Sequence, residues 1–295
     1  NKAEEFTVEE VDIFPFETLI EVIDFLNDEV TPQPFRINVI ELFEQDRNYL
    51  VDFADVKGQA EVKRAMEVAA AGSHNLIMIG LPGSGKTMLA KRLPTILPPL
   101  TLDEALETTK IHSIAGLLPS NTAIISTRPF RSPHHTASDV SLVGGGPNAK
   151  PGEISFSHNG VLFLDELTEF KKNVLEVMRQ PLEDRIVTIS RSKITVQYPC
   201  NFMLIAAMNP TPAGSQKEAS MYSDFDIQKF LSKISGPILD RIDLHIHVNP
   251  VKYQELSSKT ESEKSEKVWE RVIRARDIQI RRFCGRKGIY ENSAM

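Results

Sequence analysis

The sequence predicts an α/β fold in which helices cover both faces of a parallel sheet. Three short apolar segments, residues 75–79, 160–164 and 202–207, are typical of buried strands. Helical patterns alternate with them from residue 52 onward, which indicates a three-layer αβα core. With 295 residues, of which 41% are hydrophobic and 25% charged, the chain can bury a core of that size.

The first part of the chain differs from the rest. Residues 1–50 carry 13 acidic and 3 basic side chains, a net charge of −10, which leaves +4 for residues 51–295. A helical pattern at residues 18–27 is followed by the breaker Thr31-Pro32-Gln33-Pro34. We therefore expect residues 1–50 to be the end of an upstream domain with a linker. The charge distribution excludes a uniformly basic DNA-coating protein but allows a local basic patch.

No apolar run reaches the roughly 18 to 20 residues that span a bilayer, and residues 1–10 do not resemble a signal peptide. A cytoplasmic location with no membrane partner is the resulting expectation. Cys200 and Cys284, the only cysteines, lie in unrelated patterns and predict neither a disulfide framework nor a metal site.

A phosphate-binding loop is indicated where the first strand ends. Residues 80–87 read GLPGSGKT and match G-x-x-x-x-G-K-[S/T] between a strand and a helix. This pattern lets backbone N–H groups surround phosphate oxygens, while Lys86 reaches the β and γ phosphates and the Thr87 hydroxyl can ligate Mg²⁺. A chance glycine-rich turn is the alternative. The candidate ATP-binding residues of this segment are Gly80, Pro82, Gly83, Ser84, Gly85, Lys86, Thr87 and Met88.

Polar residues also follow the other two strands, at the edge of a parallel sheet where ligands bind. Asp165 is the candidate that, with Thr87, holds magnesium, and Glu166 is the candidate base for an attacking water. Asn209 follows the third strand, where its amide can sense the γ phosphate. An asparagine that begins a turn before Pro210 is the alternative.

These motifs resemble those of the AAA+ ATPases, with Walker A at residues 80–87, Walker B at 162–166 and sensor 1 at Asn209. Four longer segments are similar to the magnesium-chelatase-like group, and most closely to its ComM (YifB) type. They read RPFRSPHHTASDVSLVGGG, PGEISFSHNGVLFLDEL, RQPLED and SGPILDRIDLH. The resemblance covers the chain from about residue 52 to its end.

The resemblance implies roles for residues outside the strand ends. It implies that residues 52–59 pack on the adenine, through Val56 and Gly58, and that Arg241 is an arginine finger. An intrachain ion pair with Asp240 or Asp243 is the alternative for Arg241. It also implies an upstream domain like that of Lon proteases and a helical C-terminal lid.

We accordingly expect an ATPase core at residues 51–250, the start of the lid at 251–295, and a sequence that is a piece of a longer protein. Without its lid, such a piece should turn over weakly and form rings poorly. One segment departs from the family: Thr211-Pro212-Ala213-Gly214 stands where relatives often carry a cysteine-rich loop. Metal binding is therefore not expected there.

Two insertions interrupt the core pattern. On both sides of Arg191-Ser192-Lys193, side chains alternate with a period of two residues, which predicts a β-hairpin with a basic tip. The resemblance implies a pre-sensor-1 hairpin at this position. In a ring, its tip would bring Arg191 and Lys193 of every subunit to one pore, where DNA phosphates could bind. Solubilising surface charge is the alternative.

The second insertion, residues 142–155, reads LVGGGPNAKPGEIS. Its glycines follow a helical pattern and its lysine precedes a proline, which rules out a second phosphate loop. The resemblance implies a helix-2 insert near the pore, for which we expect flexible glycines at 144–146, poor order in a lone subunit and a pore-facing Lys150.

Four histidines, His112, His134, His135 and His158, could suggest a metal site near this insert. Adjacent histidines of a strand point to opposite faces, so one ion cannot readily take both His134 and His135. We expect these two side chains to pack or hydrogen-bond near the insert.

The resemblance implies Mg²⁺-dependent ATP hydrolysis by a homo-hexameric ring that drives branch migration of single-stranded or branched DNA. The alternative is the ATPase subunit of a metal-chelatase-type remodelling complex, which shares the insert architecture. A σ54-type transcription activator would carry a GAFTGA-like insert tip, which GGGPNAKPG is not. A non-catalytic nucleotide-gated scaffold is disfavoured by Glu166 and Arg241.

Overall fold

The computed structural model describes residues 14, 16, 18–33, 49–118, 122, 124–191, 194–210, 234–251, 262–284 and 291–294. Its centre is a five-stranded sheet in the order β2-β5-β8-β1-β9, and every neighbouring pair is parallel. The strands are β1 (Leu76–Gly80), β2 (Phe130–Arg131), β5 (Val161–Leu164), β8 (Met203–Met208) and β9 (Leu244–Val248). The predicted parallel α/β sheet is confirmed.

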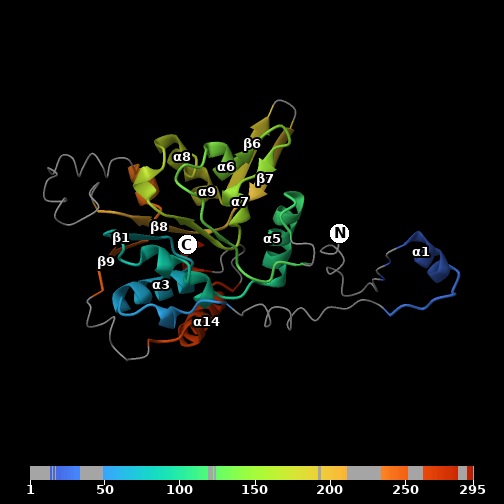
Figure 1. Cartoon of the computed structure of the whole chain (residues 1–295), viewed down its shortest axis with the longest axis horizontal. Coiled ribbons are helices and arrows are strands. Elements are labelled where there is room, and N and C mark those ends of the chain that lie inside the picture. Colours follow the sequence, from blue (N-terminus) through green and yellow to red (C-terminus); the bar gives the residue numbers. More distant parts are fainter. Residues whose placement is uncertain are drawn as a thin grey trace.

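Helices cover both faces of this sheet because its strands bury alternate residues on opposite sides. Leu76, Met78 and Phe163 belong to one apolar cluster, while Ile77 and Leu164 belong to the other. Figure 1 shows α3 and α14 on one side and α6 to α9 on the other. The three-layer arrangement is therefore that of the predicted fold class.

The first layer contains α3 (Ala60–Gly72), α4 (Lys86–Ala90), η3 (Leu93–Ile96) and α14 (Ser265–Arg282), and η2 (Phe53–Asp55) lies against it through Phe53. The second contains α6 (Asp139–Val143), α7 (Glu153–Phe156), η4 (Leu167–Glu169), α8 (Lys172–Glu176), α9 (Arg179–Asp184) and α12 (Gly236–Leu239). A capping box of Thr101 and Glu104 begins α5 (Leu102–Ile114), whose Ala105 packs in a small separate cluster.

The predicted hairpin is present as β6 (Ile186–Arg191) and β7 (Ile194–Pro199), which pair antiparallel. Lys193, at its tip, lies outside the described residues. Before the hairpin, the chain forms two short helices, α8 and α9, with a break at Val177 and Met178.

The expectation of poor order at residues 142–155 is wrong. The segment contains β3 (Gly144–Gly145) and β4 (Lys150–Pro151), which pair antiparallel, and Leu142, Ala149 and Ile154 are fully buried. The physical reason is that this insert packs against the hairpin, so its apolar side chains join the core on that face of the sheet.

The assumption that His134 and His135 lie in a strand is also wrong, because β2 ends at Arg131. After the strand their rings lie against each other at an interplanar angle of 35°, with centroids 4.1 Å apart. His134 contacts the hydroxyl of Thr136 at 2.9 Å, as expected for a histidine that hydrogen-bonds near the insert.

The two ends of the described chain are short helical segments. Helix α1 (Leu19–Leu26), capped by Thr18, has no buried residue and lies apart from the sheet in Figure 1. η5 (Asn292–Ala294) returns to α14 through a hydrogen bond from the Asn292 N–H to Gln279. None of the helices in the described ranges is both long and apolar enough to cross a bilayer.

Candidate nucleotide-binding and hydrolysis site

Lys86 lies at the centre of the candidate site, beside the carboxyl ends of the neighbouring strands β1 and β8. β1 pairs with β8 so that Ile79 lies opposite Met208, and the chain after each strand emerges at the same edge. Lys86 Nζ donates to the carbonyls of Gly80 at 2.6 Å and Leu81 at 3.0 Å. It also donates to Oδ1 of Asn209 at 3.2 Å. The fold thus brings together two residues 123 positions apart.

Burial strongly affects this lysine. Its side chain is only 7% exposed, and desolvation lowers the pKa of Lys86, although Asp165 and Glu166 act in the opposite direction. An ammonium held by two carbonyls and an amide can exchange these neutral partners for phosphate oxygens, which are stronger acceptors.

The loop around Lys86 fits a phosphate group. The hydroxyl of Ser84 is buried and has no hydrogen-bond partner among the residues that the structure describes, and an incoming polar group would supply one. Gly83 and Gly85 have φ of +76° and +95°, and a side chain there would meet open space. These left-handed turns aim successive N–H groups into one concave surface, which is a geometry that binds anions.

The predicted metal ligands also lie together. The Thr87 hydroxyl donates to Oδ2 of Asp165 at 2.6 Å, although the two residues are 78 positions apart. A hydroxyl and a carboxylate are hard oxygen donors of the type that Mg²⁺ binds, directly or through water. The residues therefore fit a magnesium ion bound beside the phosphates.

Glu166 lies next to this pair with a different backbone. Its φ of 52° and ψ of 49° are left-handed, and its N–H donates to Oδ1 of Asp165 at 2.9 Å. The side chain, 53% exposed, turns toward His135, whose Nδ1 lies 3.1 Å from Oε2 of Glu166. His135 also packs edge-on against Phe170. The expected base is thus accessible to water but has a histidine partner that the sequence did not predict.

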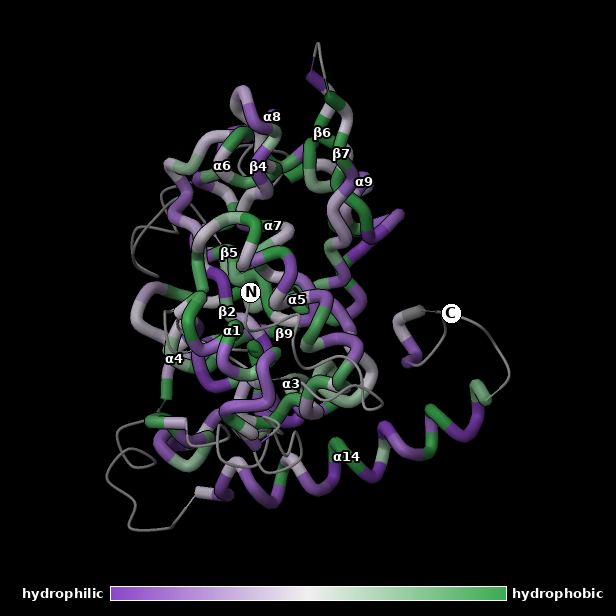
Figure 2. Tube along the Cα trace, turned by 90° about the vertical axis from the view of Figure 1, so that its right-hand side faces the viewer, coloured by the Kyte–Doolittle hydropathy of each residue, from purple (hydrophilic) through white to green (hydrophobic). Residues whose placement is uncertain are grey.

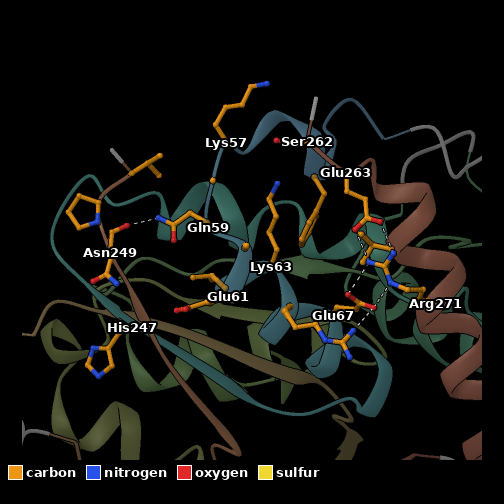
Figure 3. Close-up of a pocket in the computed structure, with 18 residues that line it drawn as sticks. Lys57, Gln59, Glu61, Lys63, Glu67, His247, Asn249, Ser262, Glu263 and Arg271 are labelled. Carbon is orange, nitrogen blue, oxygen red and sulfur yellow. Dashed lines mark hydrogen bonds and ion pairs between the residues drawn. The ribbon is translucent and has the colours of Figure 1, made fainter. Parts of the chain in front are cut away.

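A cavity of about 1030 Å³ lies beside the predicted adenine segment (Figure 3), and residues 80–88 are not among the residues that line it. Gly58 lines it, with φ of +62°, whereas the Val56 side chain is buried and its carbonyl accepts from Lys63 Nζ. The Gln59 amide donates to the carbonyls of Ser84 at 3.3 Å and Asn249 at 2.6 Å. Gln59 therefore connects the cavity wall to the phosphate loop, a link that the motif alone did not reveal.

Met88 completes the set of predicted ATP-binding residues. It is 40% exposed on α4, and its carbonyl accepts from Nη1 of Arg92 at 3.0 Å. Pro82 lies in the turn between β1 and α4.

Arg241 does not lie at the carboxyl edge of the sheet, where Lys86 and Asn209 meet. It precedes β9, and its carbonyl accepts from the Asn75 side chain at the amino end of β1, roughly 16 Å along the strand from Gly80. Its guanidinium pairs with Glu183 at 2.8 Å rather than with Asp240 or Asp243. Both side chains are about half exposed, and Arg241 lowers the pKa of Glu183. This position cannot serve the site of its own chain but can face a neighbour.

The three predicted DNA contacts lie away from the nucleotide site. Lys150 is exposed on β4 and Arg191 ends β6, so both belong to the end of the molecule formed by insert and hairpin. Lys193 is outside the described residues.

A parallel sheet with the order β2-β5-β8-β1-β9 carries a phosphate loop after β1, an acidic pair after β5 and an asparagine after β8. This combination defines a P-loop NTPase of the AAA+ class. Within this class, residues 52–256 match the family described as "Magnesium chelatase, subunit ChlI", and the chain belongs to that family. More specifically, it is a magnesium-chelatase-like AAA+ protein of the ComM type.

Relatives support this assignment. The chain is 44% identical over 280 residues to Competence protein ComM of Haemophilus influenzae, covering 94% of this chain and 55% of that protein. It is 46% identical over 235 residues to YifB of Salmonella typhimurium, covering 78% and 46%. Identity to the Magnesium-chelatase 67 kDa subunit of Heliobacterium mobile is 26% over 224 residues, covering 65% and 30%. The chain spans about half the length of the first two relatives.

Proposed function

We propose that this protein is a Mg²⁺-dependent ATPase that works as a ring, as a hexamer in the whole protein, and moves DNA during recombination. The observation that carries the ATPase part is the convergence of Lys86, Asn209, Thr87 and Asp165 at one sheet edge. The DNA part is supported by the 44% identity to a competence protein and by the exposed cations of insert and hairpin.

In the proposed reaction, Lys86 and the loop N–H groups bind the β and γ phosphates of ATP. Mg²⁺, beside Thr87 and Asp165, would neutralise charge on these oxygens. Glu166 accepts the proton of the attacking water, and the amide of Asn209 holds that water in line. Gly58 and the cavity beside it receive the adenine.

Arg241 would complete the site of the next subunit in the ring. A positively charged finger that meets the transferring phosphoryl group is worth about 10³- to 10⁵-fold in rate where such residues have been measured. The position of Arg241 at the opposite edge of the sheet supports this role, because an arginine near its own Lys86 would not require a ring.

The same proposal assigns parts of the chain. Residues 51–250 would form the ATPase core, 1–50 the end of an upstream domain, and 251–295 the start of a lid, with α14 already packed on α3. A cytoplasmic location is part of the proposal. Lys150, Arg191 and Lys193 would contact single-stranded or branched DNA.

Hydrolysis is tested with the full-length protein and Glu166→Gln. We expect ATP binding to be retained and the rate of hydrolysis to fall by about 10² to 10⁴, the range for loss of a general base. Lys86→Ala should instead weaken nucleotide binding. Full activity of Glu166→Gln would contradict the assignment of the base.

The DNA part needs its own measurement. Hydrolysis is recorded with and without single-stranded and forked DNA, and DNA binding is compared for wild type and the double variant Arg191→Ala/Lys193→Ala. The proposal that the protein moves DNA would be refuted if DNA left the rate of ATP hydrolysis unchanged and the double variant bound DNA as well as wild type.

A second candidate is favoured by the family description and by the chelatase subunit at 26% identity. In this alternative the same ATPase remodels a partner that inserts Mg²⁺ into a porphyrin. Stimulation of hydrolysis by such a partner protein and not by DNA would select it.

A further inference from the structure

The insert and the hairpin lie at the same end of the molecule and contact each other. Figures 1 and 2 both show β6 and β7 beside α6 and α7, the helices that flank β3 and β4. The Tyr198 hydroxyl of β7 donates to the carbonyl of Ala149 at 3.0 Å. We call residues 142–155 and 186–191 with 194–199 the tip unit.

The inner face of the tip unit is apolar and close-packed. Val187, Ile189 and Tyr198 of the hairpin are each at most 8% exposed. They share one cluster with Leu142 and Ala149 of the insert. Burial of this many apolar groups opposes independent movement of the two loops.

Hairpin side chains occupy the space that a β-carbon would take at two glycines of the insert. A β-carbon on Gly144 would lie 2.8 Å from Cδ1 of Ile189 and 2.3 Å from the carbonyl oxygen of Lys150. A β-carbon on Gly145 would lie 2.5 Å from Nη2 and 3.6 Å from Cζ of Arg191. The guanidinium of Arg191 therefore rests directly on the Gly145 backbone.

We propose that Arg191 locks the insert onto the hairpin by packing its guanidinium on Gly145, so that the two elements move as one rigid tip unit. The planar, weakly hydrated guanidinium suits contact with a peptide plane, which a lysine ammonium does not. Arg191 then positions the insert in addition to its proposed contact with phosphate, and Lys150, exposed on the strand that pairs with Gly145, is a further cation that the lock holds in place.

The lock does not depend on the proposed DNA function, but its consequence for phosphate binding rests on it. As a phosphate contact, Arg191 could be replaced by lysine with little loss, since the charge is retained. As a lock, it could not, because a lysine cannot cover Gly145 in the same way.

Amide hydrogen exchange of residues 144–151 in the full-length protein tests the lock. We expect Arg191→Lys to raise the exchange rate there by about tenfold, as a local opening becomes easier. Gly145→Ala should have the same effect, because the new methyl group displaces the flexible guanidinium. Unchanged exchange in both variants would overturn the proposal.

Gly146→Ala is the matched control. Gly146 also has a positive φ, +77°, but a β-carbon there would have no atom of the described residues within 4 Å. Its substitution also places a side chain at positive φ without touching Arg191, although the strain there differs from that at Gly145, whose φ is +149°, and exchange at residues 144–151 should stay well below that of Gly145→Ala. Equal exchange in the two alanine variants would show that backbone strain, not the lock, is responsible.

A second measurement separates the lock from the proposed function. DNA-stimulated hydrolysis should fall at least about threefold in Arg191→Lys, although its charge is unchanged. If exchange responds as expected while wild-type hydrolysis ignores DNA, the lock stands and the DNA function fails. If Arg191→Lys binds DNA and exchanges like wild type, the lock fails.

Discussion

The side chain of Glu166 is exposed to solvent and is also restrained by a contact with His135. The backbone of this residue is left-handed, and its carboxylate contacts His135, which follows β2. The pair is an ion pair only when His135 is protonated. In either protonation state the contact competes with the water that Glu166 is proposed to activate.

Loss of this contact should free the base. We expect His135→Ala to raise basal hydrolysis by about 1.4- to fivefold, because a half-exposed pair is worth about 0.2 to 1 kcal/mol. The check is the steady-state rate together with the nucleotide dissociation constant, which should not change. His134→Ala is the control, since His134 contacts Thr136 rather than Glu166. A lower rate in His135→Ala would mean that the histidine orients Glu166 instead of restraining it.

At the scale of elements, α14 is fastened to α3 by charge as well as by apolar packing. Val268 and Val272 join the core, and Arg271 forms paired hydrogen bonds with both Glu67 and Glu263 (Figure 3). Burial raises the pKa of Glu67, but hydrogen bonds from Arg271 and Arg64 outweigh it, and the net pKa is lowered. The hydrogen bond from Arg271 likewise lowers the pKa of Glu263.

The pH dependence of this contact follows from these directions. A carboxyl with a lowered pKa in the folded state contributes stability above its ordinary pKa of 4.5, and loses it as pH falls through the lowered value. Arg271→Met should therefore cost about 1 to 2 kcal/mol at pH 7, and less below about pH 4. Urea unfolding at both pH values measures this.

Arg274→Met is the matched control for that experiment. Arg274 is exposed on the same helix, so its loss should change stability by less than about 0.5 kcal/mol at either pH. A cost of Arg271→Met that is equal at pH 7 and at low pH would show that lost packing, rather than the ion pairs, is responsible.

At the scale of the whole molecule, the residues with proposed functions lie in three separate places. Lys86 lies at the carboxyl edge of the sheet, Arg241 at the amino edge, and the tip unit at one end beyond the second helical layer (Figure 1). A single chain therefore cannot join Arg241 to its own phosphate loop, and catalysis by both requires a second copy.

Mixing two inactive variants tests this arrangement. Lys86→Ala retains Arg241, and Arg241→Ala retains the phosphate loop, so each full-length variant alone should hydrolyse ATP at least about 10²-fold more slowly. An equal mixture should recover activity, because about a quarter of the interfaces in random rings contain both functional residues. A mixture as inactive as its components would contradict action in trans. Arg241→Ala that hydrolyses ATP at the wild-type rate would remove Arg241 from the mechanism.

Sequence was sufficient where a short run of residues carries both the geometry and the chemistry. The phosphate loop, the acidic pair after β5 and the alternation of the hairpin depend on local backbone geometry, and adjacent residues encode it. Three of the five central strands, β1, β5 and β8, were predicted to within a residue from their apolar runs, whereas β9 was not predicted.

The contacts that needed the fold join residues far apart in the chain. Those of His135 with Glu166, Gln59 with Ser84, and Arg191 with Gly145 span 25 to 46 positions and have no local pattern. The insert glycines show the difference most clearly. Their composition suggested flexibility, whereas packing against Ile189 and Arg191 makes the absence of a side chain a condition for close contact. The composition of a segment indicates the conformational freedom that it has in isolation. Its tertiary contacts decide how much of that freedom remains in the folded protein.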